Sequence, residues 1–263
     1  MSKRALMIGN SHVGAYMRAL QQSDQDLGID LECVAAHGDR LQAYTIEDGL
    51  FCGNFDDPDG KAARAGRKER ARLADFDAIL VTGMRFSIFH VTQVFRDLGV
   101  VAMDSARDHE TAARNGMTLI SEALLRRIIV DRLSNALAMD VVRDLRQATD
   151  LPIWVMCQPR PTRQVLVKGT RFGTFCSALE RGSGAFISET YERLAHETCA
   201  RVGAHYMAQP PETIDEDLFT DTRFMVGTLR PPFWQKNGRK VDFRHANARY
   251  GERMLTHLAA KLA

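Results

Sequence analysis

The 263-residue sequence has little cysteine, and the cysteines it has are not arranged for pairing. There are five of them, an odd number, and no two form a Cys-x-x-Cys motif. A disulfide framework needs an even set and a zinc site needs closely spaced ligands, so the sequence disfavours both. The eight histidines also lack a metal-like spacing. We therefore expect a reducing compartment, no metal and no cofactor.

Long apolar runs and an excess of one charge are missing as well. No stretch is long enough to span a bilayer, and the apolar run before Gly9 is too short for a signal peptide. The formal net charge of +2 does not call for nucleic acid or an anionic membrane as a partner. We expect a cytoplasmic protein with no nucleic-acid or membrane partner, whose specificity comes from a site. The sequence leaves its oligomeric state open.

We expect residues 1–263 to fold as one domain, because 45% of the side chains are hydrophobic and can bury a full core. Five short apolar runs end at glycine or polar residues and predict strands. The first run begins at Ala5, and the other four cover 29–36, 77–82, 151–157 and 204–208. Helical patterns lie between them, so we expect an α/β fold with a five-stranded parallel sheet and helices on both faces. Ligands bind at the carboxyl edge of such a sheet.

The segments between these strands have less uniform patterns. We expect helices over 12–22, 56–75, 86–98 and 189–202, one or two helices over 117–148, a loop over 104–115, irregular chain over 213–240 and a final helix after His245. Residues 160–187 combine basic, aromatic and glycine residues without a clear period. We interpret this segment as an insert that recognises substrate or forms a lid, with a packed structural excursion or a subunit contact as the alternatives.

Ser11 follows the first predicted strand in the stretch Gly9-Asn10-Ser11-His12, and helical spacing resumes at Val13. A serine between a strand end and a helix start is exposed where an oxyanion could be stabilised, which suits a nucleophile. The alternative is that Ser11 only caps the helix, because serine is a preferred N-cap residue. His12 follows directly, and we expect it at the edge of the site.

Asp242 and His245 stand near the other end of the chain, just before the last predicted helix. An aspartate three residues before a histidine can accept a hydrogen bond from one imidazole nitrogen while the other faces outward. The alternative is a solvated Asp-x-x-His pair at a helix start.

The two stretches together resemble conserved blocks of the SGNH (GDSL-type) hydrolases. Gly9-Asn10-Ser11-His12 is similar to the Gly-Asp-Ser-Leu block, and Asp242-x-x-His245, with Asn247 and Tyr250-Gly251 after it, is similar to the last block. The resemblance implies a flavodoxin-like three-layer sandwich with a catalytic triad of Ser11, His245 and Asp242. It also implies esterase, lipase, deacetylase or acyltransferase activity.

The resemblance also implies an oxyanion hole, and here this sequence departs from the family. Gly38, after the second predicted strand, corresponds to the glycine that donates a backbone N–H. Gly83 matches the Gly-x-Asn-Asp block, but Arg85 stands where the block has its oxyanion asparagine. Arg85 could replace that donor or bind an anionic group of the substrate.

We therefore carry two classes of function forward. The first is a serine-dependent ester hydrolase, an esterase or deacetylase acting on a small-molecule or glycan ester, with acyl transfer to a sugar as a variant. The second is a non-catalytic ligand-binding protein that retains the fold, which the missing asparagine would favour.

Overall fold

The computed structural model describes residues 2–23, 26–36, 40–53, 67–167, 172–227 and 243–262. The central sheet contains strands β1 (Lys3–Gly9), β2 (Ile29–Ala35), β5 (Arg67–Lys68), β7 (Ala78–Thr82), β10 (Ile153–Met156) and β11 (His205–Met207). The helices are α1 (Val13–Gln22), α3 (Ile88–Thr92), α4 (His109–Arg114), α5 (Glu122–Ser134), α6 (Leu137–Ala148), α7 (Gly173–Glu180), α8 (Gly184–Ala200) and α9 (Ala248–Leu262).

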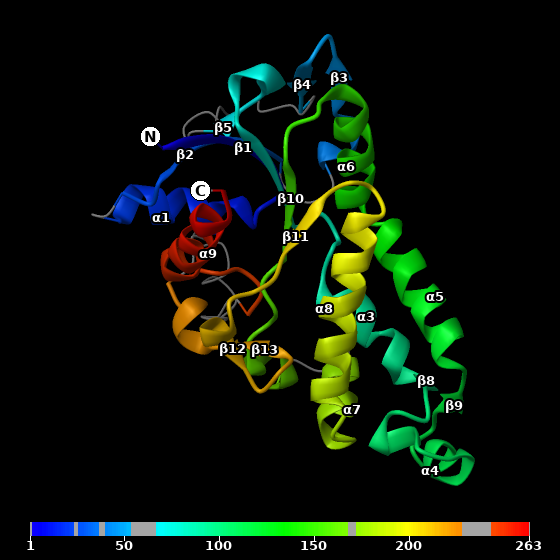
Figure 1. Cartoon of the computed structure of the whole chain (residues 1–263). Coiled ribbons are helices and arrows are strands. Elements are labelled where there is room, and N and C mark those ends of the chain that lie inside the picture. The colour runs from blue at the N-terminus through cyan, green and yellow to red at the C-terminus, as the bar shows by residue number, and fades with distance from the viewer. Residues whose placement is uncertain are drawn as a thin grey trace.

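The predicted fold class is confirmed. The strands lie in the order β11-β10-β7-β1-β2-β5, and every pairing is parallel. The five predicted strands are all present, and the two-residue strand β5 extends the edge beside β2. Helices α1 and α9 cover one face of the sheet, while α6 and α8 lie on the other (Figure 1). The result is a three-layer α/β sandwich of the flavodoxin-like type.

The inner strands form because their apolar residues are buried on both faces. All five residues of β7 are buried, as are the last five of β1. A parallel sheet covered by helices on both faces requires such continuous apolar strands. β1 pairs with β7 up to Gly9 and Thr82, so the two strands end side by side at the carboxyl edge.

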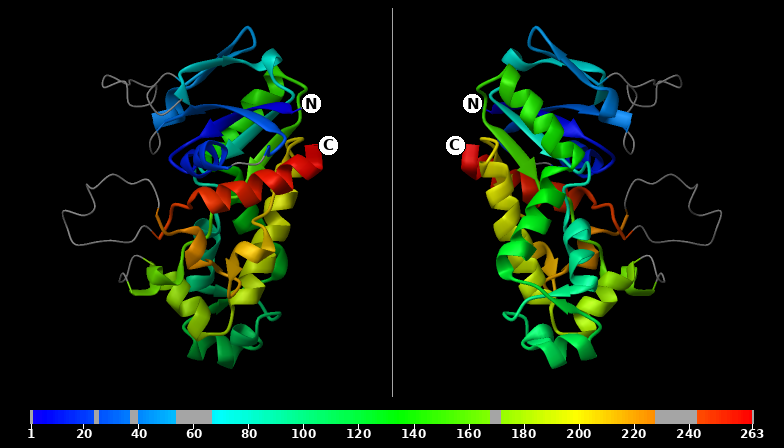
Figure 2. Two further views of the ribbon diagram at one scale, coloured as in Figure 1. Left: turned by 90° about the vertical axis from the view of Figure 1, so that its left-hand side faces the viewer. Right: turned by 90° about the vertical axis from the view of Figure 1, so that its right-hand side faces the viewer.

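A helical extension continues beyond this edge. Figures 1 and 2 show α5 and α8 running past the sheet toward a cluster that contains α4 and α7. Two short strands, β8 (Leu98–Gly99) and β9 (Thr118–Leu119), pair in parallel in the same region. Within the described residues, no helix is both long and apolar enough to cross a membrane.

Smaller elements complete the described chain. One antiparallel sheet contains β3 (Thr45–Glu47), β4 (Leu50–Cys52) and β6 (Arg70–Arg72). A second antiparallel sheet contains β12 (Ile214–Asp215) and β13 (Phe219–Thr220). The 3₁₀ turns are η1 (Arg40–Ala43), η2 (Leu73–Asp75), η3 (Val94–Arg96), η4 (Asp104–Ala106), η5 (Arg163–Val167), η7 (Pro211–Thr213) and η8 (Thr222–Phe224).

Several local predictions are wrong in the described segments. The predicted helix at 56–75 is replaced over 67–75 by β5, β6 and a 3₁₀ turn, because Ala71 is buried opposite Phe51 while Arg70 and Arg72 stay exposed. Residues 54–66 lie outside the described residues. The predicted helix at 86–98 is split into α3 and η3, and the loop at 104–115 contains α4. The irregular chain expected over 213–240 forms the β12–β13 hairpin and η8 in its described part.

Residues 160–187, which have no clear period in the sequence, form regular structure over part of their length. The segment contains η5, α7 and the start of α8. α7 is held by aromatic packing, because Phe175 is buried and its ring meets that of Phe89 at 5.2 Å and that of Phe219 at 6.0 Å. The described part of the segment is therefore packed, and its roles in substrate recognition, as a lid or in a subunit contact stay predictions.

Candidate active site

Ser11 lies in the tight turn between β1 and α1, at the carboxyl edge of the sheet. Gly9 ends β1, and a Cβ atom there would come within 2.6 Å of the carbonyl oxygen of Thr82 on β7. Only glycine therefore lets the two strand ends approach this closely. The Oδ1 of Asn10 accepts a hydrogen bond from the backbone N–H of His12 at 3.2 Å, which closes the turn around Ser11.

The Ser11 hydroxyl does not cap α1. The N-cap position is His12, and no side chain makes a capping hydrogen bond there. Instead the backbone N–H groups of Val13 and Gly14 bond to the carbonyls of Asn10 and Ser11. Within the described part of the chain, the backbone N–H of Ser11 donates to no acceptor. The hydroxyl and the N–H are both available for chemistry.

The hydroxyl of Ser11 faces His245. Its Oγ lies 2.8 Å from the Nε2 of His245 in a hydrogen bond that joins residues 234 positions apart. Both side chains are partly buried, so each keeps a surface open to a ligand. This is the separation that a nucleophile and its general base require.

His245 is held in place by anchors on both sides of it in the chain. Before it, the carbonyl of Phe243 accepts a hydrogen bond from the N–H of Thr162 at 3.1 Å. After it, the side-chain amide of Asn247 donates to the carbonyls of Arg223 and Val226 at 2.9 and 2.8 Å. Asn247 also accepts from the N–H of Tyr250 in the first turn of α9. These bonds fix the short segment that presents the imidazole to Ser11.

The ring of His12 stacks on the ring of His245. The ring centroids are 4.9 Å apart and the planes differ by 20°. His12 is 8% exposed, so the face of His245 that it covers is shielded from solvent. Sequence reasoning placed His12 only at the edge of the site. The stack could not be inferred from the sequence, because nothing local to either histidine specifies its distant partner.

Gly83 lies directly beside Asn10 and His12. A Cβ atom at this position would overlap the side-chain amide of Asn10 and come within 3.0 Å of the His12 ring. Its φ of +74° is also a left-handed conformation that side chains disfavour. In the described chain, the N–H of Gly83 donates to no acceptor. The structure thus brings Gly83 to the same place as Ser11 and His245.

The other predicted site residues are not brought into this contact. Asp242 and Gly38 lie outside the described residues, so their roles stay predictions. Arg85 is exposed, lies near His90 and follows Gly83 by two residues in the same left-handed turn.

The buried thiols are poor rivals to Ser11 as nucleophiles. Burial raises the pKa of Cys157 to about 12 and that of Cys199 to about 12, so both stay protonated at neutral pH. Cys157 also lies 3.6 Å from the Tyr250 hydroxyl, inside the core. Among the described residues, no three His, Cys, Asp or Glu side chains are grouped as metal ligands would be.

No model of a known protein family matches the chain, and no curated protein matches it either. The interpretation of the site therefore rests on its own geometry.

Proposed function

We propose that this chain is a serine-dependent ester hydrolase resembling the SGNH type. The contact of 2.8 Å between Ser11 and His245 carries the proposal. Two residues from opposite ends of the chain meet at the carboxyl edge of the sheet, where α/β folds bind ligands. A hydroxyl that caps no helix and faces an imidazole nitrogen is the arrangement of an activated nucleophile.

The proposed reaction has two halves. The Ser11 oxygen attacks the ester carbonyl while His245 Nε2 takes the hydroxyl proton, and the imidazolium then returns that proton to the departing alcohol. An acyl-serine remains. Water attacks it with His245 again as base, which releases the carboxylic acid and restores the Ser11 hydroxyl. Because Nε2 faces Ser11, a carboxylate that orients the ring would bind at Nδ1, a role that we propose for Asp242.

The negative oxygen of each tetrahedral intermediate needs hydrogen-bond donors. The backbone N–H of Ser11 and that of Gly83 have no acceptor in the described chain, which supports them as donors. We propose Gly38 as a further backbone donor on the family resemblance alone. The exposure of Arg85 argues against its guanidinium as the replacement for the missing asparagine.

For substrate we propose a small-molecule or glycan ester, with acyl transfer to a sugar hydroxyl as the variant in which an alcohol replaces water. All five cysteines are free thiols, which supports the cytoplasm as the proposed location.

A first prediction tests the nucleophile. Ser11→Ala should lower the hydrolysis of 4-nitrophenyl acetate by at least about 10³-fold, because the acyl-enzyme can no longer form. A fluorophosphonate should label Ser11 in the wild-type protein, as located by peptide mass spectrometry. Loss of labelling in His245→Ala would identify the base.

The matched control for His245 is His257, which is also on the C-terminal segment and bonds to Glu212 at the surface. His257→Ala should label and hydrolyse like the wild type. A purified Ser11→Ala protein with full turnover would refute the nucleophile. A folded wild-type protein that never labels would favour the non-catalytic binding protein.

A further inference from the structure

The turn after β7 is strained, and it presents Arg85. Gly83, Met84 and Arg85 have φ values of +74°, +50° and +70°, so three consecutive residues are left-handed although two carry side chains. Such conformations cost free energy and concentrate at functional sites. Met84 and Phe86 are fully buried on either side of Arg85 and hold the turn in place. The turn therefore joins the nucleophile, beside Gly83, to an exposed guanidinium.

The turn leads to His90 on α3. Burial, followed by the positive charges of Arg132 and Arg85, lowers the pKa of His90, so both charged side chains lie near this ring, while the backbone of Arg85 has a smaller, opposing effect. The ring is therefore neutral at physiological pH and can serve as a hydrogen-bonding partner between two cations.

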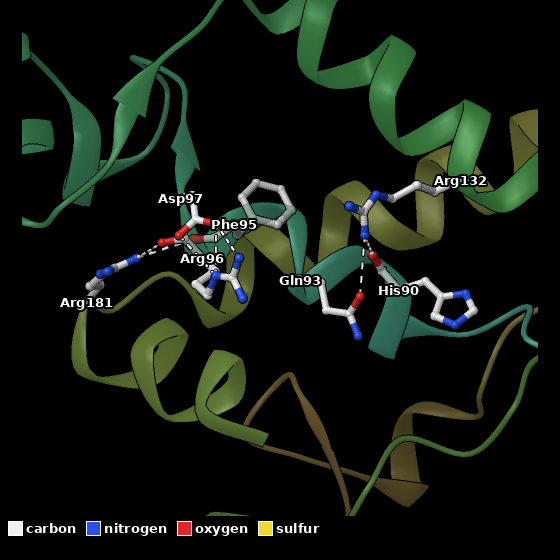
Figure 3. Close-up of polar contacts among 7 residues, drawn as sticks. All are labelled: His90, Gln93, Phe95, Arg96, Asp97, Arg132 and Arg181. Carbon is white, nitrogen blue, oxygen red and sulfur yellow. Dashed lines mark hydrogen bonds and ion pairs between the residues drawn. The ribbon is translucent and has the colours of Figure 1, made fainter. Parts of the chain in front are cut away.

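A pocket of about 350 Å³ opens beside this ring. Its lining comes from α3, from the last turn of α5 and from the residue that follows each helix, namely His90, Gln93, Asp131, Arg132 and Asn135. The guanidinium of Arg132 lies 3.4 Å from the His90 carbonyl and 3.4 Å from the Gln93 side-chain oxygen, as Figure 3 shows. Both acceptors are neutral and both bonds are long, so the described residues leave most of the donor capacity of Arg132 unused.

The charges around this pocket favour an anion. Asp131 is its only carboxylate among the described lining residues, and it is engaged by Arg127 at 2.9 Å. In the described chain, Arg132 forms no ion pair with a carboxylate. The guanidinium group binds carboxylate and phosphate oxygens through paired hydrogen bonds.

We infer that Arg85, His90 and Arg132 form a subsite for an anionic group of the substrate, a carboxylate or a phosphate, next to the reacting ester. This inference rests on the proposed ester chemistry at Ser11. The strained turn sets the spacing, since one end of it meets the nucleophile and the other end meets the subsite. Arg85 would then be a binding residue for the charged part of the ester.

The test compares phenyl acetates that carry a carboxamide, a carboxylate or a phosphate at the same ring position. Arg85→Gln and Arg132→Gln should each raise KM for the charged esters by about tenfold, because one charge-assisted interaction is lost, and leave kcat and the neutral ester unchanged. The charged ester with the lower wild-type KM identifies which anion the subsite prefers. Equal KM values for all three esters in the wild type would overturn the inference while leaving the hydrolase intact.

Arg181→Gln is the matched control. Arg181 donates to the carbonyls of Phe95 and Arg96 and so caps η3 (Figure 3). Arg132 caps α3 in the same way, through the carbonyl of His90. It should leave every KM unchanged. If Arg181→Gln raised KM as much as Arg132→Gln does, loss of helix capping would explain both effects and the subsite would be refuted.

A binding measurement separates the subsite from the chemistry. Inorganic pyrophosphate added to the Ser11→Ala protein should shift the His90 ring resonances in a saturable way by NMR, and Arg132→Gln should abolish that shift. This result would sustain the subsite even if no ester were hydrolysed. Absence of the shift in the folded protein, together with equal KM values for charged and neutral esters, would remove it.

Discussion

At the scale of single residues, the stack of His12 on His245 has a direct consequence for the proposed base. When His245 accepts the proton of Ser11, it becomes an imidazolium whose face lies against a second ring at 4.9 Å. The electron-rich face of a neutral ring stabilises such a cation, whereas a second charged ring would repel it. We therefore assign His12 a positioning role toward His245.

The second prediction follows from this stack. His12→Ala should lower kcat by about tenfold, the rate equivalent of a partly desolvated cation–π contact, with little change in KM. His12→Phe keeps an aromatic face and should recover most of that loss in a steady-state assay of the purified variants. If the alanine variant matched the wild type, or if phenylalanine failed to improve on alanine, the positioning role would be wrong.

At the scale of elements, the distance between Ser11 and His245 depends on how α1 and α9 pack. Each helix begins just after one of the two residues, and Figure 2 shows the two helices side by side. Gly251 makes this close approach possible, because a Cβ atom there would overlap the backbone of Ala15 on α1. A Cβ atom added at Gly14, which also lies on α1, would have no neighbouring atom within 4 Å.

The third prediction compares these two glycines. Gly251→Ala should destabilise the fold by about 3 kcal/mol through overpacking, and it should also lower kcat, since α9 must move away from α1. Gly14→Ala should be neutral or should stabilise by up to about 1 kcal/mol, because alanine is the better helix former. Urea unfolding and ester turnover measure both effects. Equal stabilities for the two variants would contradict the proposed close contact.

At the scale of the whole molecule, a buried polar network joins the sheet to the segments beyond its edge. Arg160, 2% exposed, pairs with Glu192 at 2.7 Å and donates to Ser188 at 2.8 Å, both on α8. Its backbone N–H donates to the Gln209 side chain, and its carbonyl accepts from the Thr220 hydroxyl. One residue thus connects the exits of β10 and β11, the β12–β13 hairpin and α8.

The fourth prediction concerns this network. Glu192→Ala leaves the Arg160 charge buried without its carboxylate, and it should destabilise the protein by about 3 kcal/mol. The control is Glu110→Ala, which breaks an exposed pair with Arg114 and should cost less than about 1 kcal/mol. Urea denaturation curves for the two variants decide the matter. A Glu192→Ala protein as stable as the control would show that the network contributes little.

The sequence by itself determined the strands, and it placed Ser11 directly after the first of them. Runs such as Ala78–Thr82 are apolar at every position except the last. Such continuous apolar character is required only of a strand that is covered on both faces, and each run stops at a glycine or polar residue. The parallel order and the polar carboxyl edge follow from these runs and the helices between them. Ser11 and His245 were selected because the stretches around them resemble the first and last blocks of the SGNH hydrolases, since the local pattern alone also fits a capping serine and a solvated Asp-x-x-His pair.

Only the tertiary structure decided what these residues touch. The contact between Ser11 and His245 and the stack on His12 join opposite ends of the chain, and nothing local to either end specifies their distance. The same holds where prediction failed. Arg70–Arg72 became a strand because β4 offered a partner, and α7 formed where Phe175 could be buried. Local propensities amount to a fraction of a kilocalorie per residue, so burial and pairing with distant segments outweigh them.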